Sequence, residues 1–378
     1  METKLSNRNV WKSLGADRAP HRCHIKTGFF LLLTLVFLLT AIAYVSGFPL
    51  ETAVLPDTLY KKVLNQIRSY YVVTEYPPAS ENQTIFLKPK SVQQSPTQTT
   101  DISVHHHVAH PSNYHFTLDE PDKCSQWDPF LVLMVPVAPH QREARNAIRS
   151  TWGNESSVQG KAVLTLFLVG LTGGAEAQQQ LEEESRQHRD LLQSNFVDSY
   201  FNLTIKTMVI MDWLATRCPQ ATFSMKVDSD MYINVENLMT LLLSPNTPRQ
   251  NYITGYLMRN RSVIRNKKSK WYVSQELYPE PKYPTYLLGM GYVFSNDLSE
   301  KIVEASKEVK SFNIEDAYVG ACLKQLGVAP SSPPDSSQFR AYLGQYNREN
   351  FLRVITTILR SPQQLIDIWK DVKQIKLE

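Results

Sequence analysis

The sequence has few cysteines and few clustered positive charges. Its 378 residues include only four cysteines, and 40 Lys and Arg against 36 Asp and Glu leave a net charge of +4. A nucleic-acid-binding surface needs clustered cations with interleaved aromatics, and the only short basic run spans residues 261–270, so we do not expect a nucleic-acid partner. No internal repeat is present, which excludes a repeat architecture. The 42% hydrophobic content is enough for one large domain with appendages.

A long hydrophobic run without charges occurs near the N-terminus. Residues 28–48 form a 21-residue stretch that, as a helix, would be about 31 Å long and would cross a bilayer. We favour an uncleaved anchor over a signal peptide, because residues 41–43 (Ala-Ile-Ala) are only a weak cleavage site. Positive charges dominate residues 1–27, which predicts a cytoplasmic tail there and a luminal location for everything after residue 48.

Residues 49–122 are rich in Pro, Ser, Thr, Gln and His and predict a flexible stem. The histidines at 105–107 and 110 have no Cys or carboxylate partners nearby, so we do not expect a metal site in the stem. Four glycosylation sequons lie on the predicted luminal side and agree with this orientation. They begin at Asn82, Asn154, Asn202 and Asn260.

Residues 123–378 alternate between short apolar runs and helical patterns. Strands are expected at 130–137, 162–170 and 221–227, with helices at 140–152, 175–193 and 203–218 between them. This alternation predicts an α/β fold with an open, mostly parallel sheet flanked by helices. Further strands are expected at 252–258 and 286–295, and further helices at 235–243, 298–309, 315–326 and 363–375.

Two carboxylates stand at the end of the central apolar run. Asp228 and Asp230 are one residue apart and directly follow a run that should be buried, where unpaired carboxylates would be costly. Ligands of open α/β sheets bind at the carboxyl ends of the strands. The pair is therefore predicted to hold Mn²⁺, with Mg²⁺ as an alternative, against a nucleotide diphosphate, although a solvated turn would give the same short pattern.

Two other charged groups accompany these acids. Arg142, Arg145 and Arg149 lie on the helix after the first strand, where they could face phosphates or simply a solvated surface. Glu315 and Asp316 open a helix, where carboxylates serve equally well in capping or in catalysis.

The luminal cysteines predict one disulfide. Cys124 precedes the first strand and Cys218 ends the helix before the central strand, so the two can meet at one edge of the sheet. Cys322 lies inside an apolar helix and is expected to remain free.

Between residues 124 and 327 the sequence contains a set of ordered motifs: Arg142-Glu-Ala-Arg-Asn-Ala-Ile-Arg-Ser-Thr-Trp-Gly153, Phe201-Asn-Leu-Thr204, Lys226-Val-Asp-Ser-Asp230, Ser269-Lys-Trp-Tyr272 with Leu277-Tyr-Pro279, Tyr283-Pro284, Gly289-Met-Gly-Tyr292 and Glu315-Asp-Ala-Tyr-Val-Gly320. Together and in this order, these motifs resemble the β-1,3-galactosyltransferase family of Golgi enzymes. The resemblance implies a GT-A-type, type II Golgi membrane transferase that moves galactose from UDP-galactose to a glycoprotein or glycolipid acceptor with inversion. The Asp-Ser-Asp form is closer to the galactosyl than to the N-acetylglucosaminyl branch.

The resemblance also assigns roles residue by residue. Asp228 and Asp230 become the metal site, and Asp316 becomes the general base that accepts the acceptor's proton. The donor pocket comprises these two acids with Arg142, Arg145, Arg149, Ser229, Gly289 and Gly291. Trp271, Tyr272 and Glu315 would contact the acceptor, although Trp271 could equally be a core residue.

The chain departs from the family pattern in three places. Leu287 and Gln345 stand where the family has cysteines, which fits the loss of one disulfide as a unit. No histidine follows His188, so Gln338, or Asn347 if the alignment slips, takes the place of a common third metal ligand. Two alternatives therefore stay open: an N-acetylglucosaminyltransferase using UDP-GlcNAc, and a non-catalytic Golgi glycan-binding or chaperone protein with the same fold.

Overall fold

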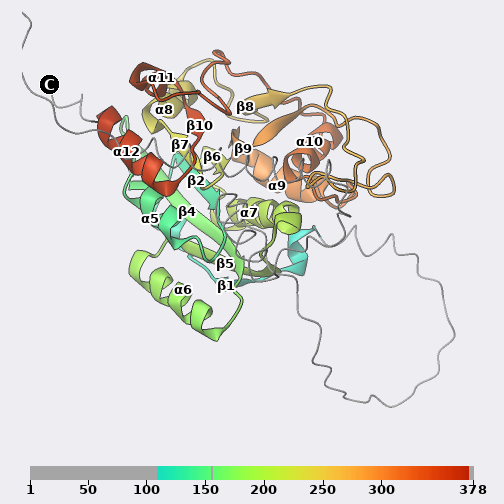
Figure 1. Ribbon diagram of the computed structural model, residues 1–378, viewed down its shortest axis with the longest axis horizontal. Coiled ribbons are helices and arrows are strands. Elements are labelled where there is room, and N and C mark those ends of the chain that lie inside the picture. The colour runs from blue at the N-terminus through green and yellow to red at the C-terminus, as the bar shows by residue number, and fades with distance from the viewer. Residues whose placement is uncertain (1–108, 155, 374–378) are drawn as a thin grey trace, which may run out of the picture. The chain divides into compact units, whose positions relative to one another are not determined.

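A mixed eight-stranded sheet forms the centre of the protein in this computed structural model, which describes residues 109–154 and 156–373 (Figure 1). The predicted tail (1–27), membrane segment (28–48) and most of the predicted stem, with Asn82, lie outside the described residues. Among the helices that are described, none has the length and hydrophobicity needed to cross a membrane.

The elements have the following bounds. The strands are β1 (Phe116–Leu118), β2 (Leu131–Pro136), β3 (Ser157–Val158), β4 (Lys161–Leu171), β5 (Leu191–Val197), β6 (Phe223–Val227), β7 (Met231–Ile233), β8 (Ile253–Met258), β9 (Tyr286–Ser295) and β10 (Thr356–Ile358). The α-helices are α4 (Lys123–Trp127), α5 (Arg142–Arg149), α6 (Ala175–His188), α7 (Leu203–Arg217), α8 (Val235–Leu243), α9 (Asp297–Ala305), α10 (Glu315–Gln325), α11 (Arg348–Arg353) and α12 (Pro362–Lys373). Short 3₁₀ helices are η2 (Pro111–Asn113), η3 (Trp152–Asn154) and η4 (Tyr200–Asn202).

The sheet is parallel in its middle and antiparallel at both edges. Its order is β1-β5-β4-β2-β6-β9-β8, and β3 pairs with β4. The contiguous strands β5, β4, β2 and β6 run parallel, whereas β1, β9 and β8 each pair antiparallel with their neighbours. The parallel centre agrees with the sequence prediction. Its carboxyl edge is where α/β sheets bind their ligands.

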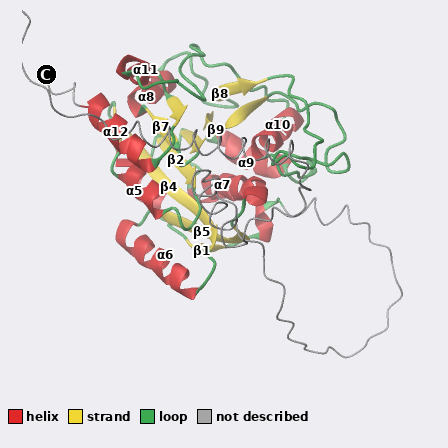
Figure 2. Cartoon of the chain, in the orientation of Figure 1, coloured by secondary structure: helices red, strands yellow, loops and turns green. Residues whose placement is uncertain are grey.

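Helices cover both faces of this sheet, as Figure 2 shows. Strand β2 is buried throughout, and alternate side chains enter two separate hydrophobic cores because successive strand residues point to opposite faces. Leu131, Leu133 and Val135 pack in one core with residues of α5, α8 and α12. Val132 and Met134 pack in the other with residues of α7, α9 and α10. The two covered faces explain why the strands read as continuous apolar runs.

Strand β5 corrects one sequence prediction. The helix expected over 175–193 ends at His188, because Arg189 adopts a left-handed conformation with a φ of 54° and terminates it. Residues 191–197 then form β5, whose first four residues are buried. Leu191 and Leu192 fit the end of a helix as well as the start of a strand, so the apolar periodicity alone does not distinguish a longer helix from a new strand here.

The folded region also begins before residue 123. Strand β1 pairs with β5, and Glu120, which is buried, forms an ion pair with Arg189 at 3.0 Å. Asp119 accepts a hydrogen bond from the indole N–H of Trp213 at 2.8 Å. The end of the predicted stem therefore belongs to the α/β domain.

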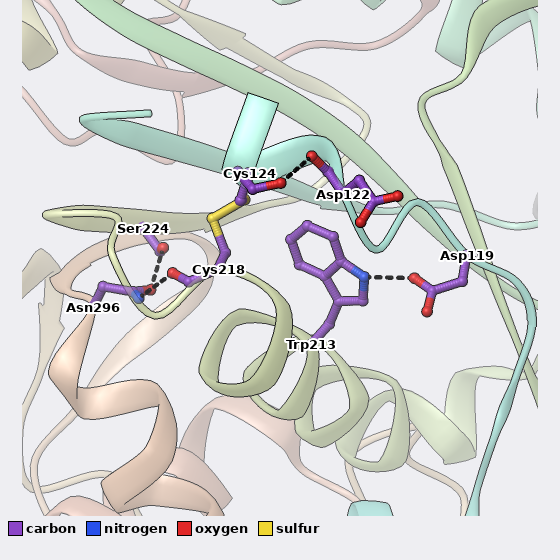
Figure 3. Close-up of a disulfide and its surroundings, with 8 residues drawn as sticks. Asp119, Asp122, Cys124, Trp213, Cys218, Ser224 and Asn296 are labelled. Atoms are coloured by element: carbon purple, nitrogen blue, oxygen red, sulfur yellow. Dashed lines mark hydrogen bonds between the residues drawn. A yellow bond between two sulfur atoms is a disulfide. The ribbon is translucent and has the colours of Figure 1, made fainter. Parts of the chain in front are cut away.

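A disulfide joins Cys124 to Cys218, the pair that the sequence predicts, and Cys322 is a buried free thiol (Figure 3). The Cys218 carbonyl accepts a hydrogen bond from Asn296 at 2.9 Å, and Ser224 of β6 donates to the same asparagine at 2.7 Å. The bridge thus ties the start of the domain to the loop that leads into the central strand.

The C-terminal segment lies near the carboxyl end of the central strand β6. Strand β10 pairs antiparallel with β7, which directly follows the two acids, and α12 packs beside α5 (Figure 1). The Leu359 N–H donates to the Asp230 carbonyl at 2.7 Å. Residues far beyond the last recognisable motif therefore border the predicted site.

Candidate active site

Asp228 and Asp230 lie at the carboxyl end of β6, as the apolar run before them in the sequence predicts. The backbone N–H of Asp228 donates to the Met290 carbonyl of β9 at 2.9 Å, which fixes the turn that follows the strand. Asp228 exposes 42% of its side chain, and Asp230 is an exposed residue. Desolvation by the surrounding protein, and then the charge of Asp228, raise the pKa of Asp230 to about 6.

A buried lysine stands behind this pair. The Lys226 Nζ lies 2.7 Å from an Asp228 oxygen, 3.4 Å from a Glu315 oxygen and 2.5 Å from the Gly289 carbonyl. Burial alone would lower the pKa of Lys226, but Asp228 and Glu315 outweigh it and raise the pKa above its usual range. No role is predicted for Lys226 from the sequence. A lysine within a strand that should be buried nevertheless indicates a nearby carboxylate, because a buried charge is costly unless it is paired.

Glu315 is part of this buried network and does not face an acceptor, contrary to the sequence prediction. It is 8% exposed, and one of its oxygens accepts a hydrogen bond from the Tyr292 hydroxyl at 2.7 Å. Its other oxygen faces Lys226. Both oxygens are thereby occupied, so Glu315 neutralises the lysine and holds the tyrosine.

Asp316 is the neighbouring carboxylate and has the properties of a base. Its Oδ2 accepts the Gly289 N–H at 3.0 Å and its Oδ1 accepts the Ala317 N–H at 2.8 Å. Burial, and then the charge of Glu315, raise the pKa of Asp316 to about 7 despite these bonds. A carboxylate with a pKa near neutrality is suited to general base catalysis, because it combines ionisation with basicity.

Gly289 allows this arrangement. A Cβ at residue 289 would lie 2.9 Å from a Glu315 oxygen and 3.4 Å from the Asp316 Cβ. The strand and the start of α10 therefore approach closely only because residue 289 has no side chain. Gly291 lies one step along β9, where an added Cβ would press on Met225, so its role is packing.

The acids fit a cation shared with a ligand. Within residues 109–154 and 156–373, no group of three or more His, Cys, Asp and Glu side chains is placed to hold a metal ion. Mg²⁺ and similar cations are, however, commonly held by one or two carboxylates together with substrate phosphates. Asp228 and Asp230 supply that number of carboxylates.

Arg145 and Arg149 do not face this site. Arg145 is 1% exposed and forms a bidentate pair with Glu184 of α6 at 2.7 and 2.8 Å, while two backbone carbonyls accept its remaining bonds. Arg149 contacts Asp190 with two bonds of 2.8 Å and also reaches Glu184. Burial would raise the pKa of Glu184, but the two arginines lower it. We therefore assign both arginines to the attachment of α5 to α6.

The same helix contributes other residues to the site. A cavity of about 190 Å³ is lined by Gln141 and Ala144 of the α5 region, by Ser229 and Asp230, and by residues 359–362 and 365. Among the latter, Arg360 is exposed, and Ser361 caps α12 by accepting the Gln364 N–H at 3.2 Å. The part of α5 that borders this cavity is thus Gln141 and Ala144, and not Arg145 or Arg149, and no motif in the sequence points to Arg360. Arg142, half exposed and 3.7 Å from Glu184, remains at the surface.

Exposed aromatic rings gather near Asp316. Trp271 is 49% exposed, and Tyr200 and Phe201 of η4 are 40% and 66% exposed. The Lys270 Nζ lies 4.7 Å from the Trp271 ring and 5.5 Å from the Tyr200 ring, which brings the two segments together. Desolvation, and next the charge of Asp316, raise the pKa of Tyr200, so the Tyr200 hydroxyl lies within the electrostatic field of Asp316. The half-buried Tyr272 accepts a bond from Asn313 and anchors the loop.

The remaining predicted sites are distributed over the surface. Asn154 and Asn260 are exposed, whereas Asn202 is partly buried and donates to the Val197 carbonyl at 2.8 Å. Gln338 is partly buried, and its carbonyl accepts bonds from Ile355 and Thr356. These contacts fix the Gln338 backbone beside β10.

Parts of this sequence are similar to known proteins. Residues 143–334 match the family described as Galactosyltransferase. Beta-1,3-galactosyltransferase 2 of Homo sapiens is 44% identical over 274 residues, which cover 71% of this chain and 65% of that protein. Beta-1,3-galactosyltransferase 1 of Mus musculus is 40% identical over 267 residues, covering 70% and 81%. A solved structure, galactosyltransferase LgtC with donor and acceptor sugar analogs, matches at a TM-score of 0.34 and 9% identity over 64% of this chain and 96% of that one. The family profile covers the central strand, the two acids and Asp316, and the chain belongs to the galactosyltransferase family.

Proposed function

We propose that this protein transfers galactose from UDP-galactose to a glycan on a protein or lipid, with inversion and formation of a β-1,3 linkage. One observation carries the proposal. Asp228 bonds to Met290 and Asp316 bonds to Gly289, so adjacent residues of β9 hold a donor-side carboxylate and a base. The family supports galactosyl transfer, and the relatives' names supply the linkage.

Asp316 would act on the acceptor. Its carboxylate accepts the proton of the acceptor hydroxyl while that oxygen bonds to the anomeric carbon of galactose. The bond from this carbon to the diphosphate oxygen breaks in the same displacement, which inverts the configuration and releases UDP. The two N–H donors hold the carboxylate oxygens in place throughout.

Asp228 and Asp230 would hold Mn²⁺, with Mg²⁺ as an alternative, at the donor side. When bound, such a cation stabilises the negative charge of the departing diphosphate. Lys226 orients Asp228 from behind, whereas Asp230 remains exposed toward the cavity that it lines.

The cavity beside Asp230 is the place for the diphosphate. Arg360 supplies a positive charge there, and the amino-terminal end of α12 favours a negative ligand because the helix dipole is positive at that end. These groups take over the role that the sequence assigned to Arg145 and Arg149.

Trp271, Tyr200 and Phe201 would form the acceptor platform. Sugar rings present apolar faces that stack on aromatic side chains, and these rings are exposed near the base. We further propose the predicted setting: a type II Golgi membrane protein, anchored by residues 28–48, with its sequons in the lumen.

The test compares two donors on the purified protein. UDP-galactose and UDP-GlcNAc are offered with a mixed glycan acceptor library, with and without Mn²⁺, to wild type and to Asp316→Asn. Mn²⁺-dependent galactose transfer that the substitution abolishes is the expected result. Preferential use of UDP-GlcNAc would replace the donor assignment. Metal-dependent UDP binding without transfer to any acceptor would favour the non-catalytic glycan-binding alternative.

A further inference from the structure

A second cavity, of about 540 Å³, lies outside the donor site. Its nine lining residues come from the ends of β8 and α10, the start of β9 and the segment 327–330. None of them carries a carboxylate, whereas Arg259 and Lys324 both carry a positive charge. Among the described residues, no carboxylate lies within ion-pair distance of either cation. The cavity therefore has a positive charge that the described part of the fold does not neutralise.

This cavity lies on the acceptor side of the sheet. Strand β9 pairs with β6 only from Gly291 onward, so its earlier residues extend beyond the carboxyl edge at which Asp228 stands. Met258, the last residue of β8, pairs with Tyr286 of β9 in this extension. Arg259 and Pro284 thus lie farther out along the two strands than Gly289, which holds the base.

Helix α10 connects the base to the cavity. Asp316 lies in its first turn, opposite Gly289, and Gly320 packs against Tyr286, where an added Cβ would lie 2.6 Å from the tyrosine Cβ. Lys324 follows on the last turn. Eight residues separate Asp316 from Lys324, which corresponds to about 12 Å along a helix. An oligosaccharide whose terminal hydroxyl lies at the base can extend over this length.

The loop that borders the acceptor side is also strongly basic. Residues 259–282 contain seven Lys and Arg and two Glu, a net charge of +5, whereas the whole chain carries +4. Arg265 is used internally, because it donates to the carbonyls of Val273, Tyr278 and Glu280. Arg259, Arg261, Lys267, Lys268 and Lys270 are exposed. A concentration of one sign of charge beside a binding site attracts ligands of the opposite sign.

We infer that the cavity between Arg259 and Lys324 is an acceptor subsite for an anionic group, a carboxylate or a sulfate ester, on the glycan that receives the sugar. This inference rests on the proposed function and adds the acceptor's charge to it. Lys324 also complements the negative end of the α10 dipole, but Arg259 has no such structural reason. The two cations together form a subsite that a neutral glycan leaves unfilled.

The test measures binding and transfer with matched acceptors. Full-length protein in detergent, with UDP and Mn²⁺, is titrated with a neutral galactose-terminated oligosaccharide, its O-sulfated form and a form that carries a carboxylate sugar. Wild type should bind both acidic forms more tightly than the neutral one. Arg259→Gln and Lys324→Gln should each reduce this preference by up to about fivefold, the range of an exposed ion pair, and the double variant should abolish it.

Arg186→Gln is the matched control, because it removes an exposed cation of α6 whose side chain, among the described residues, forms an ion pair with Glu183 alone. It should leave the preference unchanged. Preference for one acidic form alone identifies the anion as sulfate or carboxylate. Equal binding of neutral and acidic forms by wild type, or a preference that survives in the double variant, overturns the inference. Absence of galactose transfer with any acceptor refutes the proposed function separately, since the binding comparison does not need turnover.

Discussion

Replacing Arg145 by Met should destabilise the fold and leave donor binding intact. Arg145 is 1% exposed and its partner Glu184 has a side chain that is 2% exposed, so the pair is fully desolvated. Removing the guanidinium deprives Glu184 of two bonds and the carbonyls of Ala138 and Pro139 of one each. Breaking a buried pair in this way costs about 3–5 kcal/mol. We expect the lower end, because Arg149 still reaches Glu184.

A second variant separates charge from volume. The double variant Arg145→Met, Glu184→Met removes the Glu184 carboxylate together with its partner. Arg149 keeps its two hydrogen bonds to Asp190 in this variant. Replacing both members of a buried pair by apolar residues is often neutral or stabilising. The double variant should therefore recover most of the stability that the single variant loses.

The assay is denaturant unfolding followed by tryptophan fluorescence, with the Michaelis constant for UDP-galactose measured on the folded fraction. We expect a large drop in unfolding free energy for the single variant, recovery in the double variant and a donor constant within about twofold of wild type in both. A stable single variant whose donor constant rises tenfold would show that Arg145 faces the donor, and the structural assignment would be refuted.

Four further substitutions, three in the site and one at the disulfide, have defined expected outcomes. Asp316→Asn should lower the transfer rate by about 10² or more and leave UDP binding unchanged. In wild type, the transfer rate should fall as the pH drops below about 7, because the raised pKa of Asp316 leaves its carboxyl group protonated there. Rate–pH profiles of wild type and variant test the rate loss and the pH dependence. Asp230→Ala should abolish transfer without changing the melting temperature, since the residue is exposed; normal Mn²⁺-dependent activity would contradict this. Replacing Cys124 and Cys218 by Ala should reduce the unfolding free energy by roughly 4–5 kcal/mol on the chain-entropy model, because the bridge closes a 94-residue separation. Arg360→Gln should raise the Michaelis constant for UDP-galactose several-fold and leave that for the acceptor unchanged in initial-rate assays.

The sequence predicts the parts of the fold that local patterns determine. The central strand, the two acids at its end and the helix that begins at Glu315 all follow from apolar periodicity interrupted by carboxylates, and the structure places them as expected. The disulfide is also predicted from the sequence. Cys124 and Cys218 each precede a strand of the parallel sheet, and the parallel arrangement places the two cysteines at the same edge of the sheet.

The partners of charged residues could not be predicted in the same way. Arg145 meets a glutamate 39 residues away and Lys226 meets one 89 residues away, and no local pattern encodes such pairings. The arginines on α5 consequently looked like phosphate ligands, and Glu315 looked like an acceptor contact. No sequence motif points to Arg360, because it lies beyond the recognisable motifs, in a segment that the pairing of β10 with β7 brings to Asp230.

The buried charges imply that Asp316 and Asp230, at the two ends of the site, are held to different degrees by the fold. Lys226 touches both Asp228 and Glu315, so a single cation positions one of the two acids that follow β6 and the residue next to Asp316. Glu315 is held further by Tyr292, and Asp316 by two backbone N–H groups, which leaves the base with a fixed orientation before any ligand arrives. Asp230, by contrast, is exposed, and desolvation and then the charge of Asp228 raise its pKa, which the charge of Lys226 offsets only in part, so a bound cation would relieve the remaining repulsion. In the proposed function, the acceptor side is therefore fixed in advance, and the donor side is completed on binding.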